Sequence, residues 1–268
     1  MSHPYLKVNG TTLYYEDHRE GEGRHGGPPL LFLHGWGTSG RVWGGQLPEF
    51  ARDHRVVTVD WRGCGRSARP AQGNTVDGVV ADLAALVEAL DLRRPVVVGS
   101  SIGAAFATEL AARHPGRTAG VVSVSGPAYW PSQGAVPIRE LCEGLREDRA
   151  GCLARWVPAW FAPGASPALV DWTVRQVLDS GVFIDDHFPP LAAYDPRPLL
   201  PGLTVPVHYL HGELDTEIPL DVARTCAALT PGARATTLAG AGHLPHQERP
   251  AVFNAALRDA LAAMAPAD

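Results

Sequence analysis

Residues 96–114 read VVVGSSIGAAFATELAARH and give the clearest indication of the architecture. The run starts with apolar, β-branched residues that suit a strand buried on both faces. From residue 101 onward the composition suits a helix, which the His-Pro-Gly sequence at 114–116 should end. The junction, GSSIG at 99–103, is the G-x-S-x-G pattern of a tight strand-to-helix turn. Its small residues permit the turn and expose the central Ser101 in a cleft, while Ser100 should point away.

Short runs rich in Val, Leu and Ile alternate with helix-like stretches along the rest of the chain. They read LLFLHG at 30–35, VVTVD at 56–60, GVVSVSG at 120–126, VPVHYLHG at 205–212 and ATTLAG at 235–240. A helix is predicted over 75–91, with Asn74 as its cap and Asp77 in its first turn. Strands that alternate with helices form parallel sheets. Near the N-terminus, LKVNGTTLYYE predicts an antiparallel hairpin that turns at Asn9-Gly10.

The alternation stops between residues 127 and 203, where only helical patterns are found. Apolar residues recur at helical spacing in two places, at Ile138, Leu141, Cys142 and Leu145 and at Leu153, Trp156, Val157 and Trp160. An insertion between two sheet strands should lie over the carboxyl edge of the sheet, where open α/β folds bind ligands. We therefore predict a core domain of residues 1–126 and 204–268, with a helical cap, or lid, at 127–203.

Composition excludes several classes of partner. The chain has 268 residues, 45% of them hydrophobic, which suffices for a large core. With 23 Lys and Arg against 28 Asp and Glu the formal charge is -5, and no basic run suits nucleic acid. No targeting segment is apparent, and no apolar stretch reaches the roughly 18 residues of a membrane helix. We expect a cytoplasmic protein whose partner is a small-molecule substrate; the oligomeric state is not readable.

The cysteines and histidines do not form recognisable metal or disulfide motifs. Cys64, Cys142, Cys152 and Cys226 lack the spacing of a metal site or disulfide framework. No H-E-x-x-H pattern occurs among the 11 histidines, so no metal is expected. Cys64 lies in the Gly-rich loop DWRGCGRS, away in sequence from any histidine that could activate it, and is interpreted as structural.

A serine nucleophile needs a base, which a carboxylate in turn orients. His243 lies in GAGHLP, directly after the last strand run, and Asp215 lies in HGELD, just beyond the strand before it. Both should therefore reach the same edge of the sheet as Ser101. We favour Asp215 as the orienting acid, with Glu213 and Glu217 as alternatives.

The loop HGWG at 34–37 should complete the site. Its backbone N–H at Trp36 and that of Ile102 are the predicted oxyanion donors, whereas His34 should brace the loop. Substrate-pocket residues are predicted mainly from the cap, where most of the tryptophans gather: Trp36, Trp130, Trp156, Trp160 and His187. Because these side chains are mostly aromatic, we expect a small-to-medium apolar or aromatic substrate.

These motifs resemble the α/β-hydrolase superfamily across nearly the whole chain, from the hairpin through HGWGTSGRVW, DWRGCGRS, GSSIGA and HGELDTEIP to GAGHLPHQERPAVFN. The chain order serine, aspartate, histidine is also the order of that superfamily. The first two motifs are most similar to the cofactor-free haloperoxidase and carboxylesterase-like branch. The resemblance implies an eight-stranded, mostly parallel sheet with flanking helices, a helical cap between strands 6 and 7, and no cofactor.

Some positions depart from the patterns of particular branches. Gly37 stands where the haloperoxidase branch usually has the proline of HGWP, which the family associates with perhydrolysis, and residues 102–104 read IGA instead of MGG. The resemblance therefore implies hydrolysis rather than peroxidase-like chemistry. Ser101 excludes the branches that use an aspartate nucleophile on halides or epoxides.

We accordingly expect a serine hydrolase that cleaves a carboxylic ester or lactone through an acyl-enzyme. Two alternatives stay open. One is a C–C bond hydrolase of a vinylogous diketone, although that branch generally has asparagine at the position of Ser100. The other is a hydrolase fold used as a ligand receptor with weak turnover. The fold alone does not fix the substrate.

Overall fold

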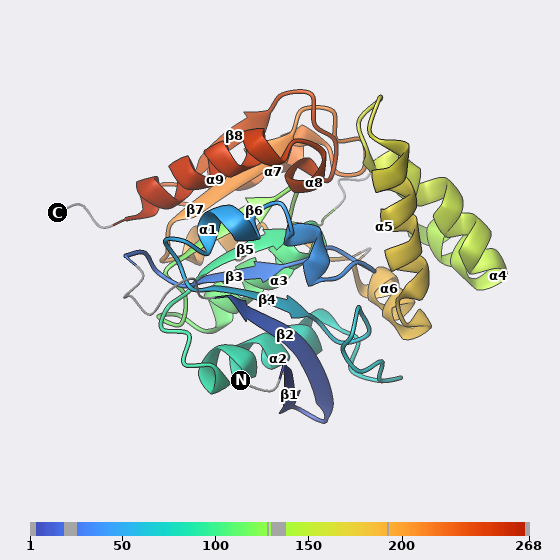
Figure 1. Ribbon diagram of the computed structural model, residues 1–268, viewed down its shortest axis with the longest axis horizontal. Coiled ribbons are helices and arrows are strands. Elements are labelled where there is room, and N and C mark those ends of the chain that lie inside the picture. Colours follow the sequence, from blue (N-terminus) through green and yellow to red (C-terminus); the bar gives the residue numbers. More distant parts are fainter. Residues whose placement is uncertain (1–3, 19–25, 128, 130–137, 192, 266–268) are drawn as a thin grey trace.

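The strands form one eight-stranded sheet in the order β1-β2-β4-β3-β5-β6-β7-β8 (Figure 1). The computed structural model describes residues 4–18, 26–127, 129, 138–191 and 193–265. Its strands are β1 (Tyr5–Val8), β2 (Thr11–His18), β3 (Leu30–Leu33), β4 (Val56–Asp60), β5 (Val96–Ser100), β6 (Gly120–Val124), β7 (Val207–Gly212) and β8 (Arg234–Leu238). β2 pairs antiparallel with β1 and β4, and all other pairs are parallel. The predicted mostly parallel sheet is confirmed.

The β1–β2 hairpin turns where the sequence predicts it. Asn9 and Gly10 have φ of 43° and 75°, the left-handed values that a two-residue type I′ turn requires. The pairing places Tyr5 opposite Tyr14, and their rings meet edge to face at 5.2 Å. The hairpin thus has a fixed register at the edge of the sheet.

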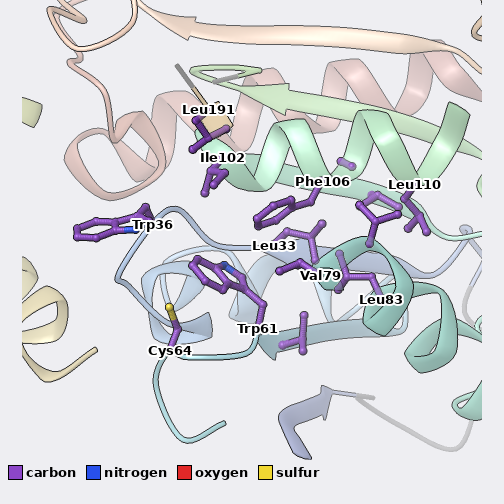
Figure 2. Close-up of a cluster of buried hydrophobic side chains, with 14 of the residues drawn as sticks. Leu33, Trp36, Trp61, Cys64, Val79, Leu83, Ile102, Phe106, Leu110 and Leu191 are labelled. Atoms are coloured by element: carbon purple, nitrogen blue, oxygen red, sulfur yellow. The ribbon is translucent and has the colours of Figure 1, made fainter. Parts of the chain in front are cut away.

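Helices cover both faces of the sheet. They are the 3-10 helix η1 (Gly40–Trp43) and the α-helices α1 (Leu47–Phe50), α2 (Val76–Ala89), α3 (Ile102–Arg113), α7 (Leu220–Leu229), α8 (Pro245–Glu248) and α9 (Pro250–Met264). Alternate strand residues point to opposite faces: Leu31 and Leu33 belong to the cluster of α2 and α3, whereas Phe32 belongs to that of η1 and α9. Figure 2 shows the first cluster, with Phe106 of α3 packed in it.

The cap of α2 differs from the expectation. Thr75, not Asn74, precedes the helix, and its Oγ1 accepts the N–H of Gly78 at 3.0 Å. The Asn74 side chain instead donates to the carbonyl of Pro70 at 2.8 Å, so it closes the preceding loop. Both residue types are good caps, and the loop geometry decides between them. Asp77 lies in the first turn as predicted.

Between β6 and β7 the described residues form helices and turns, with no strand. The elements are α4 (Ile138–Trp156), η2 (Val157–Trp160), α5 (Pro167–Asp179), η3 (Val182–His187), α6 (Phe188–Leu191) and η4 (Leu200–Gly202). Asp148, with φ of -149° and ψ of 82°, interrupts α4, so the two predicted helical patterns lie on either side of it. Figure 1 shows α4, α5 and α6 grouped on one side of the molecule. Within the described ranges no helix has the length and apolarity to cross a membrane.

Candidate active site

Ser101 occupies a strained turn between β5 and α3. Its φ of 56° and ψ of -120° lie outside the regions that L-residues ordinarily adopt. A side chain on Gly99 would place its Cβ 2.2 Å from the carbonyl oxygen of Gly103, and one on Gly103 would lie 2.6 Å from the oxygen of Leu33. The N–H of Ser101 donates to Val124 of β6 at 2.8 Å. The two glycines and this bond therefore hold the serine in a conformation that exposes it at the strand end.

His243 and Asp215 are paired by their side chains. Asp215 follows β7 and His243 follows β8, and His243 Nδ1 lies 2.9 Å from Asp215 Oδ2. The other carboxylate oxygen, Oδ1, accepts the backbone N–H groups of Glu217 and Ile218, both at 2.9 Å. The side chain of Asp215 is fully buried. Its orientation is therefore fixed from both oxygens.

The electrostatics of the pair suit a base that must become a cation. Burial by itself would raise the pKa of Asp215, but the neighbouring His243 and His211 outweigh it and lower that pKa. Burial likewise would lower the pKa of His243, but Asp215, with help from Glu217 and Glu248, raises it. The carboxylate thus stays ionised and stabilises the imidazolium form of His243.

His211, which the sequence analysis does not single out, is a second partner of Asp215. Its Nε2 lies 2.8 Å from the carbonyl of Ile218 and 3.2 Å from Asp215 Oδ2. Because a carbonyl can only accept, Nε2 carries the proton. The signal in the sequence is the histidine four residues before the aspartate, at the end of a buried strand.

Ser101 and His243 line one narrow pocket, whose cavity volume is about 30 Å³. Of the predicted pocket residues, Trp36, Trp156 and Trp160 line it. Their rings contact one another: Trp156 lies 5.6 Å from Trp36 and 5.0 Å from Trp160. The remaining lining residues are Gly35, Thr38, Ile102, Phe188, Leu191, Glu217 and Leu244. The pocket is therefore largely apolar and brings the insertion against the strand ends.

One predicted pocket residue, His187, lies elsewhere in the fold. His187 does not line this pocket; it is buried, stacked on Trp61 at 5.3 Å and edge-on to Phe106 at 6.1 Å. Neither ring nitrogen has a partner among the described residues, and burial lowers the pKa of His187 to about 4. The residue thus packs as a neutral aromatic between η3 and the core. Trp130 lies outside the described residues.

The loop after β3 lies beside the serine. A side chain on Gly35 would place its Cβ 3.6 Å from Ser101 Cβ, so the backbone at Trp36 is close to the reacting position. The indole Nε1 of Trp36 donates to the carbonyl of Ile184 at 3.2 Å, which fixes the ring over the pocket. Figure 2 shows Ile102, the first residue of α3, between Leu191 and Trp36. The two predicted oxyanion donors thus belong to segments that border the same pocket.

His34 holds this loop in place. Its Nε2 accepts the backbone N–H of Trp61 at 3.3 Å, so Nδ1 carries the proton and donates to Gly35 O at 2.8 Å. The imidazole also stacks on the Trp61 ring at 5.1 Å. Burial lowers the pKa of His34 to about 3, so the ring stays neutral. This geometry agrees with a bracing role.

Glu213 and Glu217, the two alternatives to Asp215 as orienting acid, have different environments in the fold. Glu213 is exposed and accepts the N–H of Gly240 at 3.0 Å. Glu217 is buried, lines the pocket and accepts the indole N–H of Trp156 at 2.9 Å. Only Asp215 among the three forms a hydrogen bond with His243, within the residues that the structure describes.

The alternative nucleophiles are buried. Ser100 is fully buried, and its hydroxyl has no partner among the described residues. Burial raises the pKa of the Cys64 thiol well above its usual range, which keeps it protonated and unreactive. For the described ranges, no group of three His, Cys, Asp or Glu side chains is arranged to hold a metal ion.

Comparison with known proteins agrees with this architecture. The model of the alpha/beta hydrolase family matches residues 30–256. A pimeloyl-[acyl-carrier protein] methyl ester esterase of Edwardsiella ictaluri is 30% identical, over 85% of this chain and 91% of its own. A non-heme chloroperoxidase of Streptomyces lividans is 31% identical, over 92% and 94%. The enol-lactonase of Burkholderia xenovorans LB400 superposes with a TM-score of 0.87 at 26% identity, over 97% and 100%. The chain therefore belongs to the alpha/beta hydrolase family and is a hydrolase.

Proposed function

We propose that this protein is a serine hydrolase that cleaves a carboxylic ester or lactone through an acyl-enzyme. The observation that carries the proposal is the 2.9 Å contact between His243 and a buried Asp215, in the loops that border the pocket of the strained Ser101. A nucleophile, a base and an orienting acid are the parts that acyl transfer requires. The names of the esterase and the enol-lactonase relatives support the same bond type.

In the proposed reaction Ser101 Oγ attacks the carbonyl carbon while His243 Nε2 accepts its proton. Asp215 keeps the proton of His243 on Nδ1, which leaves Nε2 free to accept, and stabilises the imidazolium. The N–H groups of Trp36 and Ile102 stabilise the oxyanion. His243 then protonates the leaving alcohol, and the same groups activate water to hydrolyse the acyl-enzyme. No step requires a cofactor.

The proposed substrate is small to medium and apolar or aromatic at the acyl group. The rings of Trp36, Trp156, Trp160 and Phe188 form most of the pocket wall. The cavity of about 30 Å³ has room for one or two water molecules, so an aromatic or medium-sized acyl group enters only if the wall moves, and a longer chain requires more movement. We propose that residues 127–203 act as a cap that sets this limit.

The loop conformation favours hydrolysis over perhydrolysis. Gly37 has φ of 70°, whereas the proline that the haloperoxidase branch usually has at this position is restricted to φ near -65°. The loop of this chain is therefore one that the proline could not adopt. A side chain on Gly37 would also place its Cβ 2.9 Å from Val177 of α5.

The proposal is tested with a fluorophosphonate probe and a panel of p-nitrophenyl esters and lactones. Ser101→Ala should abolish labelling and lower kcat by about 10³- to 10⁶-fold. Ser100→Ala is the matched control, because this neighbouring hydroxyl is buried and makes no contact in the site, and it should keep most activity. Labelling of Ser100 or Cys64 would overturn the assignment. Tight binding of esters with negligible turnover would favour a receptor.

A further inference from the structure

Among the described residues that line the pocket, Glu217 alone has a carboxyl group. Of the lining residues, Thr38, Ser101, Glu217 and His243 have polar side chains, and the tryptophans add indole N–H donors, of which that of Trp160 has no partner among the described residues. Thr38 Oγ1 donates to the carbonyl of Gly35 at 3.0 Å, so its proton is already used. Ser101 and His243 belong to the proposed reaction. Glu217 remains as a polar group that the proposed chemistry does not use.

The carboxyl of Glu217 is buried but only half satisfied. The residue is 7% exposed, and Oε2 accepts the indole N–H of Trp156 at 2.9 Å. No described residue donates a hydrogen bond to Oε1. Oε1 also differs from the interior polar atoms that are completely buried without a partner, because it keeps some accessible surface. Because Glu217 lines the pocket and Oε2 is taken by Trp156, we assign Oε1 to the pocket side of the carboxyl group. A ligand there meets one open acceptor.

The carboxyl also lacks a permanent cation. No Lys or Arg within the described ranges forms an ion pair with Glu217. Burial is the main cause that raises the pKa of Glu217. His243 and the Trp156 bond lower it by less, and nearby Asp215 makes the smallest contribution, which raises it. A carboxyl left in an apolar site without its full set of hydrogen bonds is costly. A ligand that donates a hydrogen bond to Glu217 offsets part of the free energy that burial of the carboxyl group costs.

We infer that Glu217 is a specificity-determining residue, which selects substrates that carry a hydrogen-bond donor, a hydroxyl or an amide N–H, near the reacting carbonyl. The inference rests on the proposed function and adds the substrate class. A purely alkyl substrate leaves Oε1 unpaired and desolvated. A substrate carboxylate at that position meets Glu217 and the buried Asp215, two acidic groups, and is selected against.

Trp156 sets the direction of this contact. Its indole bonds to Oε2, and its ring is held by Trp36 at 5.6 Å, Trp160 at 5.0 Å and Phe188 at 5.7 Å. The side chain of Glu217 is thereby fixed at one oxygen, so the other has a defined position in the pocket. A fixed acceptor discriminates better than a flexible one, because no side-chain entropy is lost on binding.

The experiment compares matched ester pairs that differ by one hydroxyl. The substrates are p-nitrophenyl butanoate and its 3-hydroxy analogue, for a donor in the acyl half, and the propyl and 2-hydroxypropyl butanoates, for a donor in the alcohol half. The readout is the ratio of kcat/KM within each pair, which cancels general damage to the enzyme. Wild type should prefer the hydroxylated member of at least one pair by about 10- to 100-fold, the range of a hydrogen bond to a charged group.

Glu217→Met should bring that ratio to within about twofold of one, because methionine offers no comparable acceptor. Glu217→Gln keeps the shape, but its amide oxygen is held by Trp156, so its NH₂ group faces the pocket and can only donate to the substrate hydroxyl. This variant should give an intermediate ratio and serves if the methionine variant does not fold. Glu213→Gln, in the same loop but exposed, should leave the ratio unchanged.

An unchanged ratio in folded Glu217→Met, or a wild-type preference for the alkyl member of both pairs, would overturn the inference while the proposed function stands. Absence of hydrolysis of every ester, with Ser101 unreactive to fluorophosphonate, would instead overturn the proposed function and this inference together. The two failures are thus distinguishable.

Discussion

Replacement of Asp215 by asparagine is the sharpest test of the proposed chemistry. The backbone N–H groups of Glu217 and Ile218 both donate to Oδ1 at 2.9 Å, so the amide oxygen of an asparagine must take that position. Its NH₂ group then occupies the position of Oδ2, 2.9 Å from His243 Nδ1. Two N–H donors cannot face each other. The imidazole must therefore shift its proton to Nε2.

This tautomer is the wrong one for catalysis, because Nε2 can no longer accept the proton of Ser101. The expected loss in kcat/KM is about 10⁴-fold, equivalent to about 5.4 kcal/mol of transition-state stabilisation. The fold should survive, since both backbone hydrogen bonds to Oδ1 are kept and His211, although it loses its contact with Oδ2, still donates to Ile218.

The assay is steady-state hydrolysis of a p-nitrophenyl ester, together with the rate of fluorophosphonate labelling and thermal unfolding. Both rates should fall by similar factors, with little change in Tm. Glu213→Gln is the control, because Glu213 is exposed and bonds only to Gly240 in the described part of the chain. A folded Asp215→Asn variant that retains more than a tenth of wild-type activity would refute the reasoning and point to Glu217 as the orienting acid.

The remaining predictions concern pH, the turn, the pocket and metals. Activity should decrease as the pH is lowered through the pKa of His243, which is raised above the usual value near 6.5, because only the neutral ring accepts a proton. A flat activity profile between about pH 5 and 8 would contradict this. Gly99→Ala should strongly lower Tm, since its Cβ would lie 2.2 Å from a carbonyl oxygen, whereas Gly202→Ala, with nothing within 4 Å, should not. Each added acyl methylene should raise kcat/KM at most about fourfold until the pocket is full. Trp156→Ala and Trp160→Ala should move that limit to longer chains. If acetate esters are hydrolysed best and the two variants change only Tm, the two rings serve packing and do not bind the acyl group. EDTA should leave turnover unchanged, and a loss that zinc restores would show a metal requirement.

The sheet is predictable because its determinants are local. Buried strands appear in the sequence as short runs of β-branched residues. The turn at Asn9-Gly10 needs two residues with positive φ, a conformation that few other residue pairs adopt readily. The turn at Ser101 is equally local, since Gly99 and Gly103 have no room for a Cβ. In each case a short sequence pattern indicates the backbone, although at Ser101 the distant Leu33 and Val124 also contact the turn.

Contacts made by the insertion are less predictable. His187 is an apolar-pocket candidate by sequence, yet it stacks on Trp61, because η3 docks its ring against a loop more than a hundred residues earlier in the chain. Asn74 and Thr75 are both plausible caps, and the path of the preceding loop selects Thr75. Periodicity shows that a helix has an apolar side but not what packs against it.

The acidic loop after β7 shows the same limit on a small scale. Asp215 is favoured by its spacing from the strand, and the structure pairs it with His243. Two residues on, Glu217 is by sequence an alternative to Asp215, and the sequence does not show whether it is buried. In the structure the loop reverses around the two N–H bonds to Asp215 Oδ1 and turns Glu217 inward. The bond from Trp156 completes this arrangement and comes from a helix that the sequence cannot place.

The insertion and the proposed catalytic loops are one connected unit. The N–H of His243 donates to Trp160 O at 2.8 Å, and the N–H of Ala162 donates to Glu248 Oε2, also at 2.8 Å. Glu248 accepts in addition the N–H groups of Gly242 and Leu244 on either side of the histidine, a role that the sequence analysis missed. The segment that carries Trp156 and Trp160 therefore also holds His243, the proposed base.

The contact between the segment at residues 160–162 and the loop of Gly242 and His243 links the pocket wall to His243. A side chain on Gly242 would come within 2.6 Å of the N–H nitrogen of Ala162, so the two segments cannot be moved apart or together independently. A change in the pocket wall at Trp160 alters the carbonyl that supports His243, whereas the wall formed by Phe188 and Leu191 has no such bond to the base. If His243 is the base as proposed, we expect substitutions in α6 to change the substrate range with little effect on the rate, and substitutions in η2 to change both together.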